Sequence, residues 1–210
     1  QLTAKNPGGH SSTPPQHTSV GIIAKAIADL ESHQCSAKLN RGFTDMMEYI
    51  GPEMKPLSRF VIANRWLFSA LIEKAFASFP QGNAIIRTTT AATMVEGGNA
   101  ANVLPQSAKA VINFRIAPGE TSAELIRHIK NVIRNDEIEI TPLIVDEPSI
   151  ISNTDTFGFN AVRETLCGIF PGCVAAPYIV LGGTDARRYQ NVCQNIYRIS
   201  PYQISNDDLG

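Results

Sequence analysis

The chain has 210 residues, of which 43% are hydrophobic and 18% charged, and its formal net charge is −1. This composition is that of an ordinary globular protein and excludes a disordered or fibrous chain. The charge balance argues against a general nucleic-acid binder. No apolar run reaches the roughly 18 residues that span a bilayer, so we expect a soluble protein with neither nucleic-acid nor membrane partners. The length allows one large domain, or one domain and part of another.

The start of the chain predicts a strand, a loop and a helix. Residues 2–5 are short and extended, and they end in the turn signal Asn6-Pro7-Gly8-Gly9. After two prolines a helix is expected through about His33, because apolar residues recur there at three- and four-residue steps. These residues are Val20, Ile23, Ile27 and Leu30.

A helical insertion is expected at about residues 36–82. Glycines and prolines interrupt its first half, so we predict only a short helix there, at 44–50. Its second half has a helical pattern over 57–79. The apolar residues that share one face of this pattern are Phe60, Leu67, Leu71 and Phe76.

Two strands, a helix and a further strand follow the insertion. Residues 85–95 are dense in Ile, Thr and Val, which suit a strand, and residues 108–116 alternate between apolar and polar side chains. A helix begins at the capping box of residues 121–124, where a threonine and a glutamate each bond the other's backbone amide. The last strand, 138–145, contains a proline and therefore suits a sheet edge.

The order of these elements is that of a ferredoxin-like split β-α-β sandwich, so we predict an α+β domain over residues 1–146. Residues 147–210 differ. They predict a helix at 156–169, a strand at 178–181, a turn at 182–185, a short helix, and a strand at 195–199. Two short strands cannot bury a helix by themselves, so we expect an incomplete part of an α/β domain.

Residues that bind metals are few. The histidines are His10, His17, His33 and His128, and the cysteines are Cys35, Cys167, Cys173 and Cys193. No H-E-x-x-H, H-x-D, adjacent glutamate pair or C-x-x-C occurs, which makes the sequence poor in zinc-site patterns. Because the cysteines are scattered in a chain of this size, we expect free buried thiols and no disulfide.

His10 is the histidine best placed for chemistry, because it lies in a loop flanked by glycines that permit close backbone approach. A loop histidine can donate to a developing oxyanion or transfer a proton. The alternative is a surface histidine beside a helix start. The other three histidines lie on or near helices, and we expect them to have no role in the chemistry.

Three further positions are candidates for substrate binding. Asn102 lies in a glycine-rich connection longer than a tight hairpin needs, although it could simply bond its own turn. Arg115 lies on the polar face of its strand, where it can meet a carboxylate or remain solvated. Gly183 and Thr184 follow an apolar strand and precede a helix, which is where α/β sheets bind ligands, although Asp185 may serve only as a helix cap.

Four segments together resemble a known family. They are Gly8-Gly9-His10-Ser11-Ser12-Thr13-Pro14, the loop from Gly97-Gly98 to Asn102-Val103-Leu104-Pro105, Asn113-Phe114-Arg115-Ile116-Ala117-Pro118-Gly119, and Gly182-Gly183-Thr184-Asp185-Ala186-Arg187. Their order and spacing resemble the di-zinc exopeptidases and deacylases that include aminoacylase-1, carboxypeptidase S, glutamate carboxypeptidase and succinyl-diaminopimelate desuccinylase. The likeness is strongest to the carboxypeptidase S (Gly-Xaa carboxypeptidase) branch and covers essentially the whole chain.

The resemblance implies a ferredoxin-like lid inserted into a zinc-binding α/β domain, with two lids pairing through a helix and an edge strand in a homodimer. It implies that His10 reaches the partner's active site and stabilises the tetrahedral oxyanion. It also implies that Asn102, Arg115, Gly183 and Thr184 hold the carboxylate of a small peptide or N-acyl amino acid.

In this family the ligands of the two zinc ions and the general base precede the lid, and the last zinc histidine follows a stretch like residues 205–209. We therefore expect a fragment, inactive alone, that contributes no zinc ligand. Two alternatives remain: a stand-alone ferredoxin-like module that binds an amino acid, and a non-catalytic dimerisation protein. The sequence leaves the compartment open, with the cytoplasm only slightly favoured.

Overall fold

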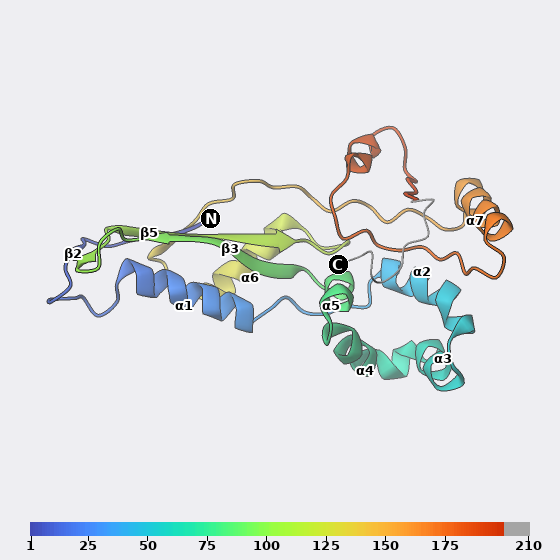
Figure 1. Ribbon diagram of the computed structural model, residues 1–210, viewed down its shortest axis with the longest axis horizontal. Helices are drawn as coiled ribbons and strands as arrows, with labels where there is room; N and C mark the ends of the chain where they lie inside the picture. Colours follow the sequence, from blue (N-terminus) through green and yellow to red (C-terminus); the bar gives the residue numbers. More distant parts are fainter. Residues whose placement is uncertain (200–210) are drawn as a thin grey trace.

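The computed structural model describes residues 1–199, and within them a four-stranded antiparallel sheet forms the elongated half of the molecule (Figure 1). Its strands are β1 (Leu2–Lys5), β3 (Thr89–Gly97), β5 (Ser107–Arg115) and β6 (Ile138–Ile140). The strand order is β3-β5-β1-β6. Helix α1 (Ser19–Ser32) leads from β1 towards β3, and β5 lies between those two strands. This is the predicted split β-α-β arrangement, and the α+β fold class is confirmed.

Helix α1 and helix α6 (Ser122–Ile133) cover the same face of the sheet (Figure 1). Between them and the sheet lies one apolar core. Its buried members are Leu2, Ala4, Ile22, Ile23, Ala26, Leu30, Ala108, Ala110, Ile129, Ile133 and Ile138. The apolar stripe of α1 is rotated from the predicted one, because Ile22 is buried whereas Val20 is 41% exposed. The predicted capping box of α6 is present, with Thr121 and Glu124 bonding each other's backbone amides.

The helical insertion comprises α2 (Arg41–Ile50), the 3-10 turn η1 (Gly51–Glu53), α3 (Pro56–Ala63), α4 (Arg65–Ala77) and α5 (Pro80–Ile86). The single long helix predicted over 57–79 was wrong, because the backbone leaves helical geometry at Asn64 and again at Phe68. The strand predicted from residue 85 begins only at Thr89. Pro80 instead starts α5, since proline suits the first turn of a helix.

The insertion has its own apolar core, separate from that of the sheet. Its buried members are Phe43, Met46, Met47, Ile62, Ile72, Ile85 and Ile86. A set of polar contacts around Thr88, which we call the polar anchor, joins the insertion to the end of the sheet where β3 begins. The Thr88 hydroxyl donates to Glu120 (2.5 Å) and accepts from the Ala117 amide (2.8 Å), and Lys38 pairs with Glu120 at 3.2 Å. Thr88 is fully buried.

The part of the chain from residue 147 onward, which we call the tail, contains α7 (Phe157–Ile169) and the 3-10 helix η2 (Asp185–Tyr189). The strands predicted at 178–181 and 195–199 were wrong, since both segments have no regular secondary structure and pair with no strand among the described residues. Ile179 and Leu181 pack instead against the core of the insertion. Ile179 comes so near α2 that a Cβ on Gly42 would lie 2.5 Å from its Cδ1, so a side chain at position 42 would displace Ile179.

Strand β6 ends at Ile140, just before Pro142, so the strand expected over 138–145 is shorter than predicted. Residues 205–209, which we compared with the stretch that precedes the last zinc histidine of the family, lie outside the described residues. The division of the chain near residue 146 stays a prediction. In the part that the structure describes, none of the helices combines the length and the apolar character needed to cross a bilayer.

Candidate functional site

His10 and Asn102 meet at one end of the sheet, which we call the tip. His10 lies in the two-residue strand β2 (Gly9–His10), which pairs with β4 (Val103–Leu104). The Ser11 amide donates to the Asn102 carbonyl at 3.1 Å. This small ladder was not expected from the sequence, although the glycines before His10 indicated close backbone approach. Gly8 has φ of +73°, and a Cβ there would lie 3.0 Å from the Leu104 carbonyl oxygen.

The His10 ring is exposed and held from one side only. Its Nδ1 accepts from the Ser12 amide at 3.2 Å and lies 2.8 Å from the Ser12 hydroxyl. Because a backbone amide can only donate, Nδ1 is an acceptor, and the neutral ring therefore carries its proton on Nε2. This leaves Nε2–H as a donor for a molecule outside the chain.

Arg115, Gly183 and Thr184 meet at the opposite end, which we call the base. Arg115 ends β5, where it pairs with Thr89. All three residues line one groove of about 510 Å³ between the sheet and the tail. The structure thus brings together three of the predicted carboxylate-binding residues, from segments nearly 70 positions apart in the chain.

Two further arginines line this groove, and the sequence analysis did not single them out for binding. Arg198 donates from Nη1 to the Thr184 hydroxyl at 2.9 Å. Arg187 pairs with Asp146 at 2.6 Å, so an acidic neighbour already balances its charge. A charged residue within the apolar segment 195–199 was the one signal that could have pointed to Arg198.

The tip and the base do not form a single site within one chain. Strand β5 runs from Ser107 near the tip to Arg115 at the base. Eight residue steps at about 3.3 Å each separate its ends by roughly 26 Å. In Figure 1, β2 lies at one extremity of the sheet, remote from the tail. A small substrate bound at the base of one chain is out of reach of the same chain's His10.

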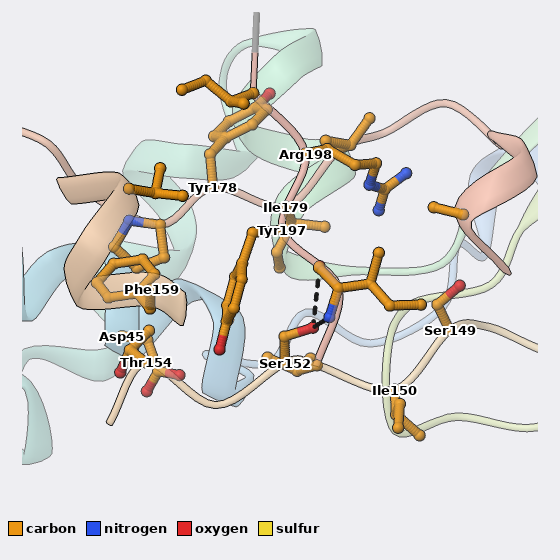
Figure 2. Close-up of a pocket in the computed structure, with 18 of the residues that line it drawn as sticks. Asp45, Ser149, Ile150, Ser152, Thr154, Phe159, Tyr178, Ile179, Tyr197 and Arg198 are labelled. Carbon is orange, nitrogen blue, oxygen red and sulfur yellow. Dashed lines mark hydrogen bonds between the residues drawn. The ribbon is translucent and has the colours of Figure 1, made fainter. Parts of the chain in front are cut away.

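An apolar cavity of about 280 Å³ lies beside the base (Figure 2). Phe159 of α7 and Tyr197 line it, with their rings tilted against each other, and Phe159 also meets Tyr49 edge-on. The Ser152 hydroxyl ties the opposite wall together, since it bonds both the amide and the carbonyl of Ile196. Arg198 lines both the cavity and the groove, so the two spaces adjoin.

Residues 1–199 contain no group of three or more His, Cys, Asp or Glu side chains placed to hold a metal ion. The donor set of this part of the chain therefore does not fit a zinc centre. His33 bonds the Asp29 carbonyl four residues earlier, and His128 of α6 bonds the His33 carbonyl at the end of α1, so neither faces the groove.

A family model described as the peptidase dimerisation domain of the M20 type matches residues 1–141. The chain belongs to the M20 peptidase dimerisation family. It is 38% identical over 203 residues to a probable carboxypeptidase S-like 2 from Dictyostelium discoideum, covering 96% of this chain and 39% of that protein. It is 34% identical over 210 residues to the N-fatty-acyl-amino acid synthase/hydrolase PM20D1 of Xenopus tropicalis, covering 99% and 41%.

Among solved structures, the chain resembles an M20 family metallo-carboxypeptidase, Sso-CP2 from Sulfolobus solfataricus, with a TM-score of 0.54 at 16% identity. That alignment covers 90% of this chain and 52% of the other, and it supports the fold. These comparisons confirm the resemblance to the exopeptidase family predicted from the sequence, and to carboxypeptidase S-like proteins within it. The chain spans 39% and 41% of the length of the two relatives named above.

Proposed function

We propose that the whole protein is a zinc-dependent hydrolase that cleaves an amide next to a free carboxylate. In it, this chain forms the dimerisation lid and part of the catalytic domain. The convergence of Arg115, Gly183, Thr184 and Arg198 on one groove carries the proposal. The family membership and the peptidase and hydrolase names of its relatives support it.

The groove at the base suits a carboxylate. The guanidinium of Arg115 can bind both oxygens of a carboxylate in parallel, a geometry that a lysine cannot offer. Arg198 bonds the Thr184 hydroxyl and can add a second positive charge beside it. Asn102 of the tip would complete the binding only from a second copy, since it lies at the far end of the sheet.

His10 would act across a homodimer. Its Nε2–H would donate to the amide oxygen as negative charge develops there, and such a donor is worth most in the transition state. The separation of tip and base argues that the histidine comes from the partner. Strand β3 lies at the edge of the sheet in the described part of the chain, so it offers the backbone for strand pairing between two lids.

Zinc would supply an activated water in the whole protein. The described residues do not fit a metal site, so we assign the metal ligands and the general base to sequence outside this chain and derive no step at the metal here. By this proposal the chain alone binds no catalytic zinc and has no hydrolase activity.

The test is an assay of the full-length protein. We expect it to hydrolyse N-acyl amino acids or Gly-Xaa dipeptides, to lose activity with a chelator, and to regain it with zinc. Matched substrates with an amidated terminus should be cleaved far more slowly. Equal turnover of the carboxylate and amide substrates would contradict the proposal that the base binds a carboxylate. No turnover in the presence of zinc would contradict the proposal that the whole protein is a hydrolase.

The groove also suits a second function, the binding of free amino acids by a stand-alone module. That function predicts micromolar binding of an amino acid by the isolated chain without metal. A protein that forms dimers, turns over no substrate and binds no amino acid would be a dimerisation protein only.

A further inference from the structure

Two cysteines of the tail lie side by side on the surface. Cys167 belongs to the last turn of α7, and Cys173 follows that helix. Their Sγ atoms are 3.7 Å apart, and both residues are exposed. The sequence analysis expected buried, scattered thiols. Only Cys35 is buried, so the expectation of buried thiols was wrong for Cys167, Cys173 and Cys193.

A tight turn creates the proximity of the two cysteines. Phe170 caps the C-terminus of α7, its amide donating to the Leu166 carbonyl, and the Cys173 amide donates to the Phe170 carbonyl at 3.1 Å. The two central residues of this turn are Pro171 and Gly172, and the glycine has φ of +81°. Proline followed by a glycine of positive φ is the signature of a type II turn. The local sequence therefore returns Cys173 to the helix.

Residues close to the pair in the sequence line the apolar cavity. Leu166, next to Cys167, lines that cavity, and so do Ala175 and Ala176, which follow Cys173. A covalent link between the two sulfurs would fasten the segment after the turn to α7. It would thereby fix one rim of the cavity.

We propose that Cys167 and Cys173 form an intramolecular disulfide site that closes when the protein meets a small-molecule disulfide of the glutathione class. The thiolate of one cysteine attacks a sulfur of the small disulfide, forming a mixed disulfide and releasing one small thiol. The second cysteine then attacks the protein sulfur of that mixed disulfide and releases the second small thiol. Two protein thiols lose two protons and two electrons, and one small disulfide becomes two thiols. The proposal does not depend on the hydrolase activity.

The pH dependence follows from the attacking species, which is the thiolate. Desolvation, together with the hydrogen bond to Cys167, raises the pKa of the Cys173 thiol above its ordinary value. Closure should therefore become faster as the pH rises into and beyond the ordinary thiol range.

The experiment treats reduced full-length protein with glutathione disulfide, blocks remaining thiols with an alkylating reagent, and analyses the peptides by mass spectrometry. We expect the peptide that contains Cys167 and Cys173 to lose two hydrogens, to carry no alkyl group, and to recover both thiols on reduction. Amide hydrogen exchange in residues 173–176 should slow on oxidation. Unchanged exchange would overturn the link to the cavity rim. Alkylation of both cysteines, or a glutathione adduct on each, would overturn the disulfide itself.

One native cysteine and two variants supply the controls. Cys193 is also exposed but lies near the Asn195 carbonyl rather than another sulfur, so it should form only a glutathione adduct. Cys167→Ser should leave a lasting glutathione adduct on Cys173. Gly172→Ala keeps both thiols, and its new Cβ would meet nothing within 4 Å, so it perturbs only the turn. We expect slower closure in this variant, with more mixed disulfide, and an unchanged closure rate would contradict the role of the turn.

Discussion

The tip and the base of the lid are the two ends of one strand, yet they are built in different ways. The tip is local: a glycine-rich loop and a two-residue ladder present His10 on an exposed surface. The base is assembled from distant segments, with Arg115 from the sheet and Gly183, Thr184 and Arg198 from the tail. A polar anchor around buried Thr88 holds that end.

This difference indicates what the sheet does. A hydrogen-bonded strand cannot shorten, so β5 keeps Arg115 about 26 Å from Ser107, and the tip that carries His10 lies at the Ser107 end. The two groups can serve one small substrate only if two copies associate with the tip of each near the base of the other. Such an arrangement would make dimerisation part of the active site.

The largest effect is expected from His10→Ala in the full-length enzyme. Loss of an oxyanion donor typically lowers kcat by about 10²–10³. We expect that decrease with little change in KM or in zinc content, measured by steady-state kinetics and metal analysis. Unchanged turnover would remove His10 from the mechanism.

Mixing variants tests the arrangement of tip and base directly. A dimer of one His10→Ala subunit and one Arg115→Gln subunit has one intact site if His10 acts across the interface. Random exchange of equal amounts makes half of the dimers mixed, so about a quarter of the wild-type activity should return. No recovery after confirmed subunit exchange would place both residues in one chain's site.

Arg115→Gln should have the next largest effect, confined to substrates with a free carboxylate. Losing a bidentate charged contact costs kcat/KM roughly 10²-fold on such substrates. Arg115→Lys should recover only part of this, because an ammonium cannot replace the planar guanidinium. The control substrate is the amidated analogue, whose slow cleavage should not change. An equal loss on both substrates would show that the arginine supports the fold rather than the carboxylate.

The sequence predicted the lid well where local physics decides the structure. The apolar alternation of β5, the capping box at Thr121 and the split β-α-β order all follow from side-chain period and hydrogen-bonding groups. The local pattern failed where tertiary packing decides. Ile85 and Ile86 look like strand residues, but the core of the insertion buries them in a helix.

The site shows the same division. His10 and Asn102 could be proposed from their glycine-rich loops, but the bond between those loops depends on the pairing of β2 with β4. Arg198 could not be assigned, because its contact with Thr184 is created by the folding of the tail rather than by any spacing pattern. The tail strands failed for a related reason, since a strand needs a neighbour to pair with.

Thr88→Val tests how much the polar anchor at the base stabilises the fold. The substitution keeps the shape of the side chain but leaves the Ala117 amide, which is in a buried residue, without its acceptor. An unsatisfied buried group costs about 1–3 kcal/mol of unfolding free energy, measurable by urea unfolding. The control is Thr93→Val, whose exposed hydroxyl makes only a long 3.3 Å bond and should matter little. Equal destabilisation by both would contradict the anchor.

Ser12→Ala should have the smallest effect and should act at the tip alone. It removes the hydroxyl 2.8 Å from His10 Nδ1 but keeps the backbone amide that also bonds this nitrogen. A neutral hydrogen bond is worth about 0.5–1.5 kcal/mol, so kcat should fall roughly two- to tenfold with KM unchanged. Ser11→Ala is the matched control, because only the backbone of Ser11 bonds Asn102. A rise in KM for the carboxylate substrate as large as the fall in kcat would mean that the tip also sets binding at the base, and the two ends would then not be independent.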